Sequence, residues 1–509
     1  MARGPISPEM NTEVLIAGAG PTGLAMALWL ARLQVPFRIV DRHPQPAAES
    51  RALAVHARTL ELYAQAGFAD TAIANGVKLE ALNLWARGKR AAHVDLGDLG
   101  AGLSPFPYVL ILAQDRHERI LGEHLAALGV RIERSVALTG FEERGNSITA
   151  RLEHADGTKE TCECAWLAGC DGAHSKVRET LGLAFPGGTY ERLFYVADVQ
   201  ATGPVVDGEL NVALDESDLL AVFPLVDEGN VRLIGTIRAQ SEDEAKQLSW
   251  DDVSRGILEH LGVTVRHVSW FSTYRVHHRV TDRFRVGRAF VLGDAAHIHS
   301  PVGGQGMNTG IGDAVNLAWK LAMVVKGQAD ARLLDTYEPE RIAFAQRLVA
   351  TTDRAFTFAS SDGPLARIVR MDLVPHALPA LFSIEASRRY FFRTLSQILI
   401  HYPHSTLSAG HAGAIHGGDR LPWTGGNFKP LESMDWQAHV YGTAPAPLTA
   451  ACREIGLALH VFPWNDAASR AGLAQDALYV VRPDGYVGLA AATPDGAELQ
   501  RYFRERRPG

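Results

Sequence analysis

The stretch EVLIAGAGPTGLAMALWLAR, residues 13–32, decides the fold. Its first part is a short apolar run of strand length, its middle is rich in glycine, and residues 22–33 have helical spacing. A second apolar run, residues 37–40, follows and ends at Asp41. A strand, a helix and a second strand in this order predict a βαβ unit, and therefore a parallel sheet with a right-handed crossover.

The glycines of this stretch have the spacing of a dinucleotide-binding turn. Gly18 permits a tight turn, Gly20 lets a pyrophosphate approach the backbone, and Gly23 lets the helix pack closely on the strand. The helix N-terminus favours phosphate charge. Asp41 follows at the end of the next strand, where its carboxylate can accept hydrogen bonds from an adenosine ribose. The alternative is a glycine-rich turn that binds no ligand.

A second segment with candidate chemistry is CDGAHSKVR, residues 170–178, which follows the apolar run 165–169. It predicts a strand, a turn and the start of a helix. A purely structural explanation is equally good for this segment alone, because Ser175 can cap the helix and Arg178 can pair with Asp171.

A third segment begins with GDAAH, residues 293–297, and continues with PVGGQGMN, residues 301–308. Asp294 follows a predicted buried strand, and ligands of open α/β folds bind at the carboxyl ends of strands. A long helix is predicted from about Met307 to Lys326, so its first backbone N–H groups form a positive dipole end. That end suits the electron-rich pyrimidine side of a reduced flavin. The alternative is a loop held only by its glycine turns.

The remaining pattern divides the chain into three units of an α/β protein. Residues 1–180 and 281–400 predict a Rossmann-like nucleotide-binding domain with a helical extension. Residues 181–280 are rich in strands and predict an inserted, mostly antiparallel sheet that holds the substrate. Residues 401–509 predict a compact C-terminal α/β domain.

Composition excludes several classes of function. The 509 residues carry 50 Lys and Arg against 57 Asp and Glu, a net charge of -7, so nothing favours binding to nucleic acid or anionic membranes. We expect no membrane span, no targeting segment and no metal site. The four cysteines include no CxxC pair, which indicates reduced, mostly buried thiols and a cytoplasmic protein.

The three segments, in this order and at these spacings, resemble the single-component FAD-dependent aromatic hydroxylases, the superfamily of para-hydroxybenzoate hydroxylase and phenol hydroxylase. The tail, with GGDRLP at 417–422 and VRPDGYV at 481–487, resembles the thioredoxin-like C-terminal domain of the phenol and aromatic-polyketide hydroxylases. The CxxC of a working thioredoxin is missing, so we expect no redox activity in the tail.

The resemblance implies roles for individual residues of the FAD site. Those expected to hold the pyrophosphate and the ribose are Gly18, Gly20, Thr22, Gly23 and Asp41. Those expected near the rest of the cofactor are Arg51, Gln114, Asp171 and Asp294, the last at the ribityl hydroxyls. Those expected beside the flavin ring are Pro301, where oxygen reacts, and Gly306, Met307 and Asn308 at the pyrimidine edge.

The resemblance also implies the reaction. NADPH or NADH docks transiently and reduces the flavin, O2 adds to form a flavin C4a-hydroperoxide, and an aromatic substrate takes its distal oxygen. A simple phenol, a polycyclic polyketide and an ansamycin-type antibiotic all remain candidate substrates, with the length favouring the last two. No catalytic residue is assigned. The residues considered as a base for a phenol are His56, Tyr195, Arg238 and His297.

Two other functions remain open at this point. One is a flavin oxidoreductase of the same fold that inserts no oxygen. The other is a flavin-binding scaffold whose tail docks a partner, although such a tail is better explained as a stability module or as part of a homodimer interface.

Overall fold

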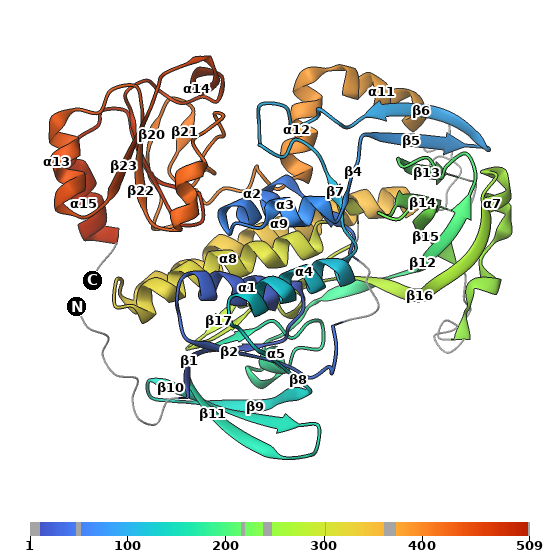
Figure 1. The fold of residues 1–509 in the computed structure, drawn as a ribbon, viewed down its shortest axis with the longest axis horizontal. Helices are drawn as coiled ribbons and strands as arrows, with labels where there is room; N and C mark the ends of the chain where they lie inside the picture. Colours follow the sequence, from blue (N-terminus) through green and yellow to red (C-terminus); the bar gives the residue numbers. More distant parts are fainter. Residues whose placement is uncertain are drawn as a thin grey trace.

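A computed structural model describes residues 11–46, 52–214, 219–237, 247–300, 302–360 and 373–506 of the chain. Figure 1 shows a central nucleotide-binding unit, a large curved sheet on one side of it, and the C-terminal unit on the other. None of the described helices is long and apolar enough to cross a lipid bilayer.

The βαβ unit predicted from residues 13–41 is present. β1 (Thr12–Ala17) pairs in parallel with β2 (Phe37–Asp41), and α1 (Pro21–Arg32) connects them. The sheet order is β17-β18-β11-β1-β2-β8, and β10 and β9 extend it from β11. The other strands are β8 (Ile132–Arg134), β9 (Val136–Arg144), β10 (Ser147–His154), β11 (Lys159–Gly169), β17 (Arg285–Val286) and β18 (Ala289–Val291).

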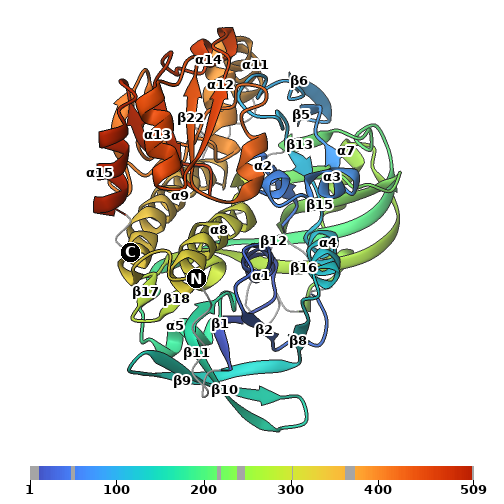
Figure 2. The ribbon, with the colours of Figure 1, turned by 60° about the vertical axis from the view of Figure 1, so that its left-hand side comes forward.

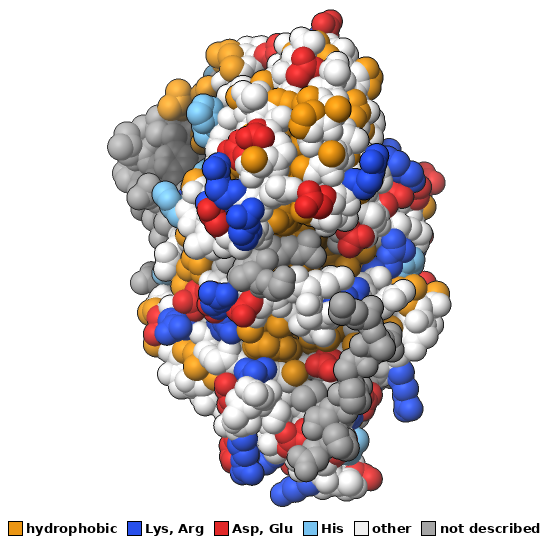
Figure 3. Space-filling model, turned by 90° about the vertical axis from the view of Figure 1, so that its left-hand side faces the viewer, with side chains coloured by type: hydrophobic (Ala, Val, Ile, Leu, Met, Phe, Trp, Pro, Cys, Tyr) orange, Lys and Arg blue, Asp and Glu red, His pale blue; other side chains and the backbone are white. Residues whose placement is uncertain are grey.

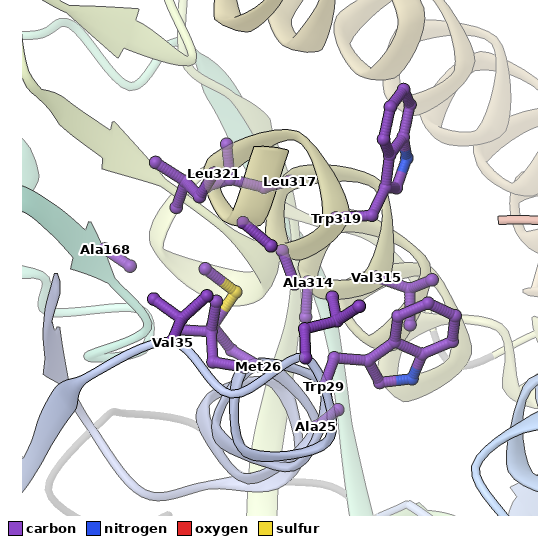
Figure 4. Close-up of a cluster of buried hydrophobic side chains, with 14 of the residues drawn as sticks. Ala25, Met26, Trp29, Val35, Ala168, Ala314, Val315, Leu317, Trp319 and Leu321 are labelled. Carbon is purple, nitrogen blue, oxygen red and sulfur yellow. The ribbon is translucent and has the colours of Figure 1, made fainter. Parts of the chain in front are cut away.

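α1 carries no charge before Arg32 because it is buried on all sides. Residues 23–30 are all buried, as expected for a helix that is apolar around its whole circumference. It packs against α8 (Gly306–Val325), the long helix predicted from 307 to 326. Figure 4 shows Met26 and Trp29 of α1 facing Ala314 and Val315 of α8 in the main core.

The glycines position α1 against the sheet. Gly18 has a φ of 102°, and a Cβ there would lie 2.2 Å from the carbonyl oxygen of Cys170. A Cβ on Gly23 would lie 1.9 Å from the Gly18 oxygen. Gly20 differs, because it has an ordinary φ of -78° and a Cβ there would meet no atom within 4 Å. Gly18 and Gly23 therefore serve packing, while Gly20 faces open space.

The second sheet has eight strands in the order β19-β16-β12-β15-β14-β13-β5-β6, and most of its pairs are antiparallel. Its strands are β5 (Ala81–Ala86), β6 (Lys89–Asp95), β12 (Gly187–Thr202), β13 (Leu210–Leu214), β14 (Leu219–Pro224), β15 (Asn230–Ile237), β16 (Thr264–Val280) and β19 (His297–Ile298). Three of these strands, β5, β6 and β19, lie outside the range 181–280 expected for this unit. β5 joins because it pairs in parallel with β13.

The C-terminal unit is α/β, as predicted, with a six-stranded sheet in the order β21-β20-β25-β24-β22-β23. Its strands are β20 (Ala409–Ala412), β21 (Ile415–His416), β22 (Gln437–Tyr441), β23 (Ala458–Phe462), β24 (Leu478–Val481) and β25 (Val487–Ala491). Its helices are α13 (Ala446–Glu454), α14 (Asp466–Arg470) and α15 (Gly496–Arg506). α13 and α15 pack on one face of this sheet and α14 on the other, and Figure 2 shows α15 at the outer edge of the unit.

The remaining elements connect these units. The helices are α2 (Ala57–Gln65), α3 (Ala69–Ala74), α4 (Gln114–Ala127), α5 (Lys176–Thr180), α7 (Arg255–His260), α9 (Tyr337–Ser360), α11 (Val374–Ser383) and α12 (Glu385–Leu395). A small sheet of three strands consists of β3 (Ala54–Val55), β4 (Val77–Lys78) and β7 (Leu110–Ile111).

Buried charges join the C-terminal unit to the helices of the nucleotide-binding unit. Arg482, after β24, donates to both carboxylate oxygens of Glu340 on α9, at 2.8 and 2.9 Å. Lys320 of α8 donates to the same carboxylate at 2.8 Å, and Asp484 accepts from Arg482 at 2.7 Å. All four side chains are at most 2% exposed. Each charge therefore depends on the others for the hydrogen bonds that water would otherwise supply.

A second group of charges joins the C-terminal unit to α2. The Arg420 Nε donates to Glu61 Oε2 at 2.8 Å, and Arg58 donates to the same oxygen at 3.1 Å. These three side chains are also buried. Figure 3 shows that the outer face over this unit carries scattered charges of both signs.

Replacing Gly18 by Ala should destabilise the protein far more than replacing Gly20 by Ala. The Gly18→Ala methyl group would clash with backbone at a strained φ, so we expect a loss of at least about 2 kcal/mol in the free energy of unfolding. Gly20→Ala should cost less than about 1 kcal/mol. Urea denaturation without added cofactor measures both values, and equal losses would contradict the packing role of Gly18.

Four buried histidines make stability depend on pH. Burial lowers the pKa of three of them to about 4 and of the fourth to about 3; they are His56, His117, His299 and His439. Between pH 6.5 and 4 the unfolded chain therefore binds protons that the folded chain does not, so stability falls as pH falls.

The free energy of unfolding should drop between pH 6.5 and 4.5 by up to about 1.4 kcal/mol per pH unit for each of these histidines. Urea midpoints measured across this range test the slope. His439→Gln should make the slope shallower, whereas His416→Gln, at an exposed histidine, should leave it unchanged. A midpoint that stays constant down to pH 4.5 would show that these side chains are protonated in the folded protein.

Candidate active site

The carboxyl ends of β1, β2 and β11 enclose a cavity of about 270 Å³. It is lined by the glycine turn after β1, by Asp41 and its neighbours, and by the turn that follows β11. The lining residues from the predicted set are Gly18, Gly20, Asp41, Gln114 and Asp171. The sequence prediction therefore concerns residues that the fold gathers at one site.

Asp41 supports the glycine turn as well as lining this cavity. Its Oδ2 accepts a hydrogen bond from the backbone N–H of Ala19 at 2.6 Å, and its Oδ1 accepts from His43 at 2.8 Å. Arg134 lies 3.7 Å from the same carboxylate. The carboxylate is thus held at the rim of the cavity with lone pairs still available to hydroxyl donors.

Asp171 carries an unsatisfied acceptor beside this cavity. Its Oδ2 accepts from the backbone N–H groups of Lys176 at 2.6 Å and Val177 at 3.1 Å. Its Oδ1 is buried and has no hydrogen-bond partner within the described part of the chain. Burial raises the pKa of Asp171. Such an oxygen fits a ligand that brings a hydrogen-bond donor, because an unpaired buried acceptor is costly.

The structural explanation considered for this segment holds only in part. Ser175 caps α5, since its hydroxyl accepts from the Arg178 backbone N–H at 3.0 Å. The Arg178 guanidinium, however, donates to the carbonyl oxygens of Ala295 at 3.0 Å and Ala173 at 2.8 Å, and not to the Asp171 carboxylate. Arg178 therefore connects the second segment to the third.

A larger cavity of about 820 Å³ continues from the first. The two share lining residues at their junction, namely Gly20, Gln114, Cys170 and Gly172. The larger cavity is lined by Thr22, Asp294, Gly306 and Met307 as well as by side chains of the second sheet. The two connected cavities have room for an elongated ligand such as FAD.

The turn that carries Asp294 is fixed by one buried carboxylate. Asp313 of α8 accepts from the Gly293 backbone N–H at 3.0 Å and from His297 Nε2 at 2.7 Å. Arg341 of α9 donates to its other oxygen at 2.6 Å. Burial opposes ionisation, but Arg341 and His297 hold the pKa of Asp313 below its usual value. His297 is therefore committed to Asp313 and does not line the cavity.

Two other histidines do line the larger cavity, His56 and His299. His56 Nε2 lies 2.8 Å from the Gly303 carbonyl oxygen, and His299 Nδ1 lies 2.9 Å from that of Ser300. These bonds require N–H at those positions, so the other ring nitrogens are acceptors, and no described residue donates to them. The sequence predicts His56 as a candidate but not His299, although His299 is the second histidine of the sequence HIH at 297–299.

Only some of the residues at the start of α8 face the larger cavity. Gly306 and Met307 line the larger cavity, whereas Asn308 does not. The Asn308 side chain accepts from the His56 backbone N–H at 2.9 Å and from Thr59 at 2.7 Å, and it donates to Ala54 and Gly304, each at 2.9 Å. Its amide is thus fully used in holding the loop to α2, which leaves only its backbone for a ligand.

Other candidates lie elsewhere. Tyr195 is buried in the core of the second sheet, with Phe271 stacked on it at 5.9 Å between ring centroids. Arg51, Arg238 and Pro301 lie outside the described residues. The second sheet contributes Phe223 and Ile234 to the cavity. No group of residues suited to a metal ion occurs in the described ranges.

Comparison with known proteins agrees with this geometry. Residues 11–352 match the family described as the FAD binding domain. A 6-methylpretetramide 4-monooxygenase of Streptomyces rimosus is 38% identical, over 82% of this chain and 75% of that protein. A pentachlorophenol 4-monooxygenase of Sphingobium chlorophenolicum is 33% identical, over 67% of this chain and 64% of that protein.

A solved structure extends the likeness to the whole chain. The anhydrotetracycline hydroxylase of Streptomyces rimosus superposes with a TM-score of 0.77 at 28% identity, covering 97% of this chain and 98% of that one. The chain therefore belongs to the FAD binding domain family and is a flavin-dependent aromatic monooxygenase.

Proposed function

We propose that this monooxygenase uses NADPH or NADH as reductant and O2 as oxidant to hydroxylate a phenolic, polyketide-type aromatic compound. The observation that carries the proposal is the larger cavity, which joins the cofactor turns to a wall of apolar side chains from the second sheet and from α11 and α12. Its volume of about 820 Å³ leaves room for a polycyclic substrate beside a flavin ring. The tetracycline-type relatives support the same substrate class.

The charge of the cavity favours a neutral substrate. Among the described lining residues there is one carboxylate, Asp294, and no Lys or Arg. A substrate carboxylate would therefore find no cationic partner there, and burying an unpaired charge is costly. A phenol or polyphenol avoids this cost, and the acceptor nitrogens of His56 and His299 offer partners for its hydroxyl groups after small side-chain rotations.

The residues of the chain would bind the cofactor as follows. The N-terminus of α1 at Gly20 accepts the pyrophosphate, because its cap carries no side-chain hydrogen bond. Asp41 binds the ribose, Asp171 contributes its unpaired oxygen, and Asp294 binds the ribityl chain. The backbone at 306–308 meets the pyrimidine edge. Bound FAD supplies the electron-transfer and oxygen chemistry, while the apolar walls exclude water and orient the substrate.

Buried thiols support the cytoplasmic setting that we propose for this enzyme. All four cysteines are free and buried; they are Cys162, Cys164, Cys170 and Cys452. Burial raises the pKa of each thiol, so none is poised to form a disulfide.

Turnover by the FAD-loaded protein tests the proposal. Polycyclic phenols such as anhydrotetracycline should accelerate NADPH or NADH consumption, and mass spectrometry should find a product heavier by one oxygen atom. Benzoates of similar size should accelerate it much less. Consumption that no phenol accelerates, with no oxygenated product, would favour an oxidoreductase that does not insert oxygen.

Asp294→Ala should weaken FAD retention. The change removes a charge-assisted hydrogen bond worth roughly 1.5–3 kcal/mol, which corresponds to about a 10- to 150-fold rise in the dissociation constant of FAD. Flavin fluorescence titration of the apoprotein measures it, and Asp294→Asn, which keeps the shape, serves as the matched control. An Asp294→Ala variant that purifies fully yellow with unchanged affinity would remove Asp294 from the cofactor site.

A further inference from the structure

The outer wall of the larger cavity is formed by two short helices, α11 and α12. Figure 1 shows α11 beside β6, at the edge of the second sheet, and α12 next to α11. They contribute six lining residues: Leu378, Phe382, Phe391, Phe392, Thr394 and Leu395. Five of these are large apolar side chains, with Leu378 and Phe382 on α11 and Phe391, Phe392 and Leu395 on α12.

Phe391 lies between this cavity and the solvent. Its side chain lines the cavity and is also 41% exposed, so the wall of the cavity is thin at this ring. Phe382, which is half-buried, also lines the cavity, and its ring contacts Phe391 edge-on with centroids 4.9 Å apart. The two rings therefore lie together in the wall of the cavity and join α11 to α12.

The neighbouring residue Phe392 has a different place. It is 1% exposed and packs onto Gly100 so closely that a Cβ there would lie 2.2 Å from the ring. Phe392 is thus anchored in the core, whereas Phe391 and Phe382 have solvent on one side. Phe382 and Phe391 can therefore move without disturbing a close contact such as that between Phe392 and Gly100.

The segment that carries these two phenylalanines exposes an unusual number of apolar side chains. Leu381 is 52% exposed, Ile384 54% and Tyr390 68%, and all three flank the two phenylalanines in sequence. Residues 373–391 supply five of the nine large apolar side chains that are exposed in the described part of the chain. Such a cluster marks a site that contacts apolar molecules.

We propose that Phe382 and Phe391 form an aromatic gate through which polycyclic substrates enter and leave the cavity. The pair determines which sizes of substrate pass. When a flat aromatic substrate passes, its ring can take the place of one phenylalanine in the edge-to-face contact. The energy of the broken contact is then largely recovered, so the barrier to an aromatic molecule is low. The role of the gate in turnover rests on the proposed function, whereas its control of access does not.

The test follows the uptake of 1-aminoanthracene, a neutral three-ring fluorophore that brightens in apolar surroundings, by the FAD-loaded protein in a stopped-flow instrument. Phe391→Ala and Phe382→Ala should each raise the association and dissociation rate constants about tenfold and change the dissociation constant less than about threefold, because they remove a barrier rather than a binding contact. Phe391→Trp should slow both rates. Tyr390→Ala, beside the gate but not in the cavity wall, is the matched control and should leave both unchanged.

Each outcome decides a different point. Three results would contradict the proposed gate. The first is that both alanine variants leave the rate constants unchanged, and the second is that Tyr390→Ala changes them equally. The third is that the fluorescence does not rise with the parent protein. If the rates shift as expected but no phenol is oxygenated, the gate stands and the proposed reaction fails. Circular dichroism confirms that each variant is folded.

Discussion

The cofactor site depends on the buried ion pair between Asp313 of α8 and Arg341 of α9. Asp313 holds the turn that carries Asp294, and Arg341 also donates to the Thr309 carbonyl at 3.1 Å and to the Tyr402 hydroxyl at 2.9 Å. This one ion pair therefore holds three parts of the fold in place: the turn after β18, the first turns of α8 at Thr309, and the segment at Tyr402 that leads to the C-terminal unit. A buried pair of this kind adds little net stability, but losing either partner leaves an uncompensated charge, so the arrangement is strongly specified.

The C-terminal unit is part of the same framework. It has neither the CxxC of a redox domain nor the exposed connection expected of a tethered docking module. Instead Arg482 and Arg420 reach buried carboxylates on α9 and α2. Since α2 begins directly after His56, which lines the larger cavity, the unit contacts the supports of the active site and not only its periphery.

The sequence predicted those parts of the fold whose causes are local. The βαβ unit, the cap at Ser175 and the start of α8 follow from periodicity, capping chemistry and glycine spacing within a few residues. The insertion of β5 into the second sheet did not follow, because its partner β13 lies more than a hundred residues away and its pairing leaves no local signal. The residues of the site divide in the same way, into those that local sequence reveals and those that depend on distant contacts. Asp41 and Asp294 could be selected because each ends a strand, but the choice of His299 over His297 depended on Asp313, whose position no sequence pattern revealed.

The charges beneath the C-terminal unit also bear on the order in which the chain is made. Lys320, Glu340 and Glu61 leave the ribosome well before Arg420, Arg482 and Asp484. Until those last residues emerge, α2, α8 and α9 present ionised groups on the faces that they will later bury. The ion pairs that dock the C-terminal unit can therefore form only after residues 420–484 have been synthesised, late in translation.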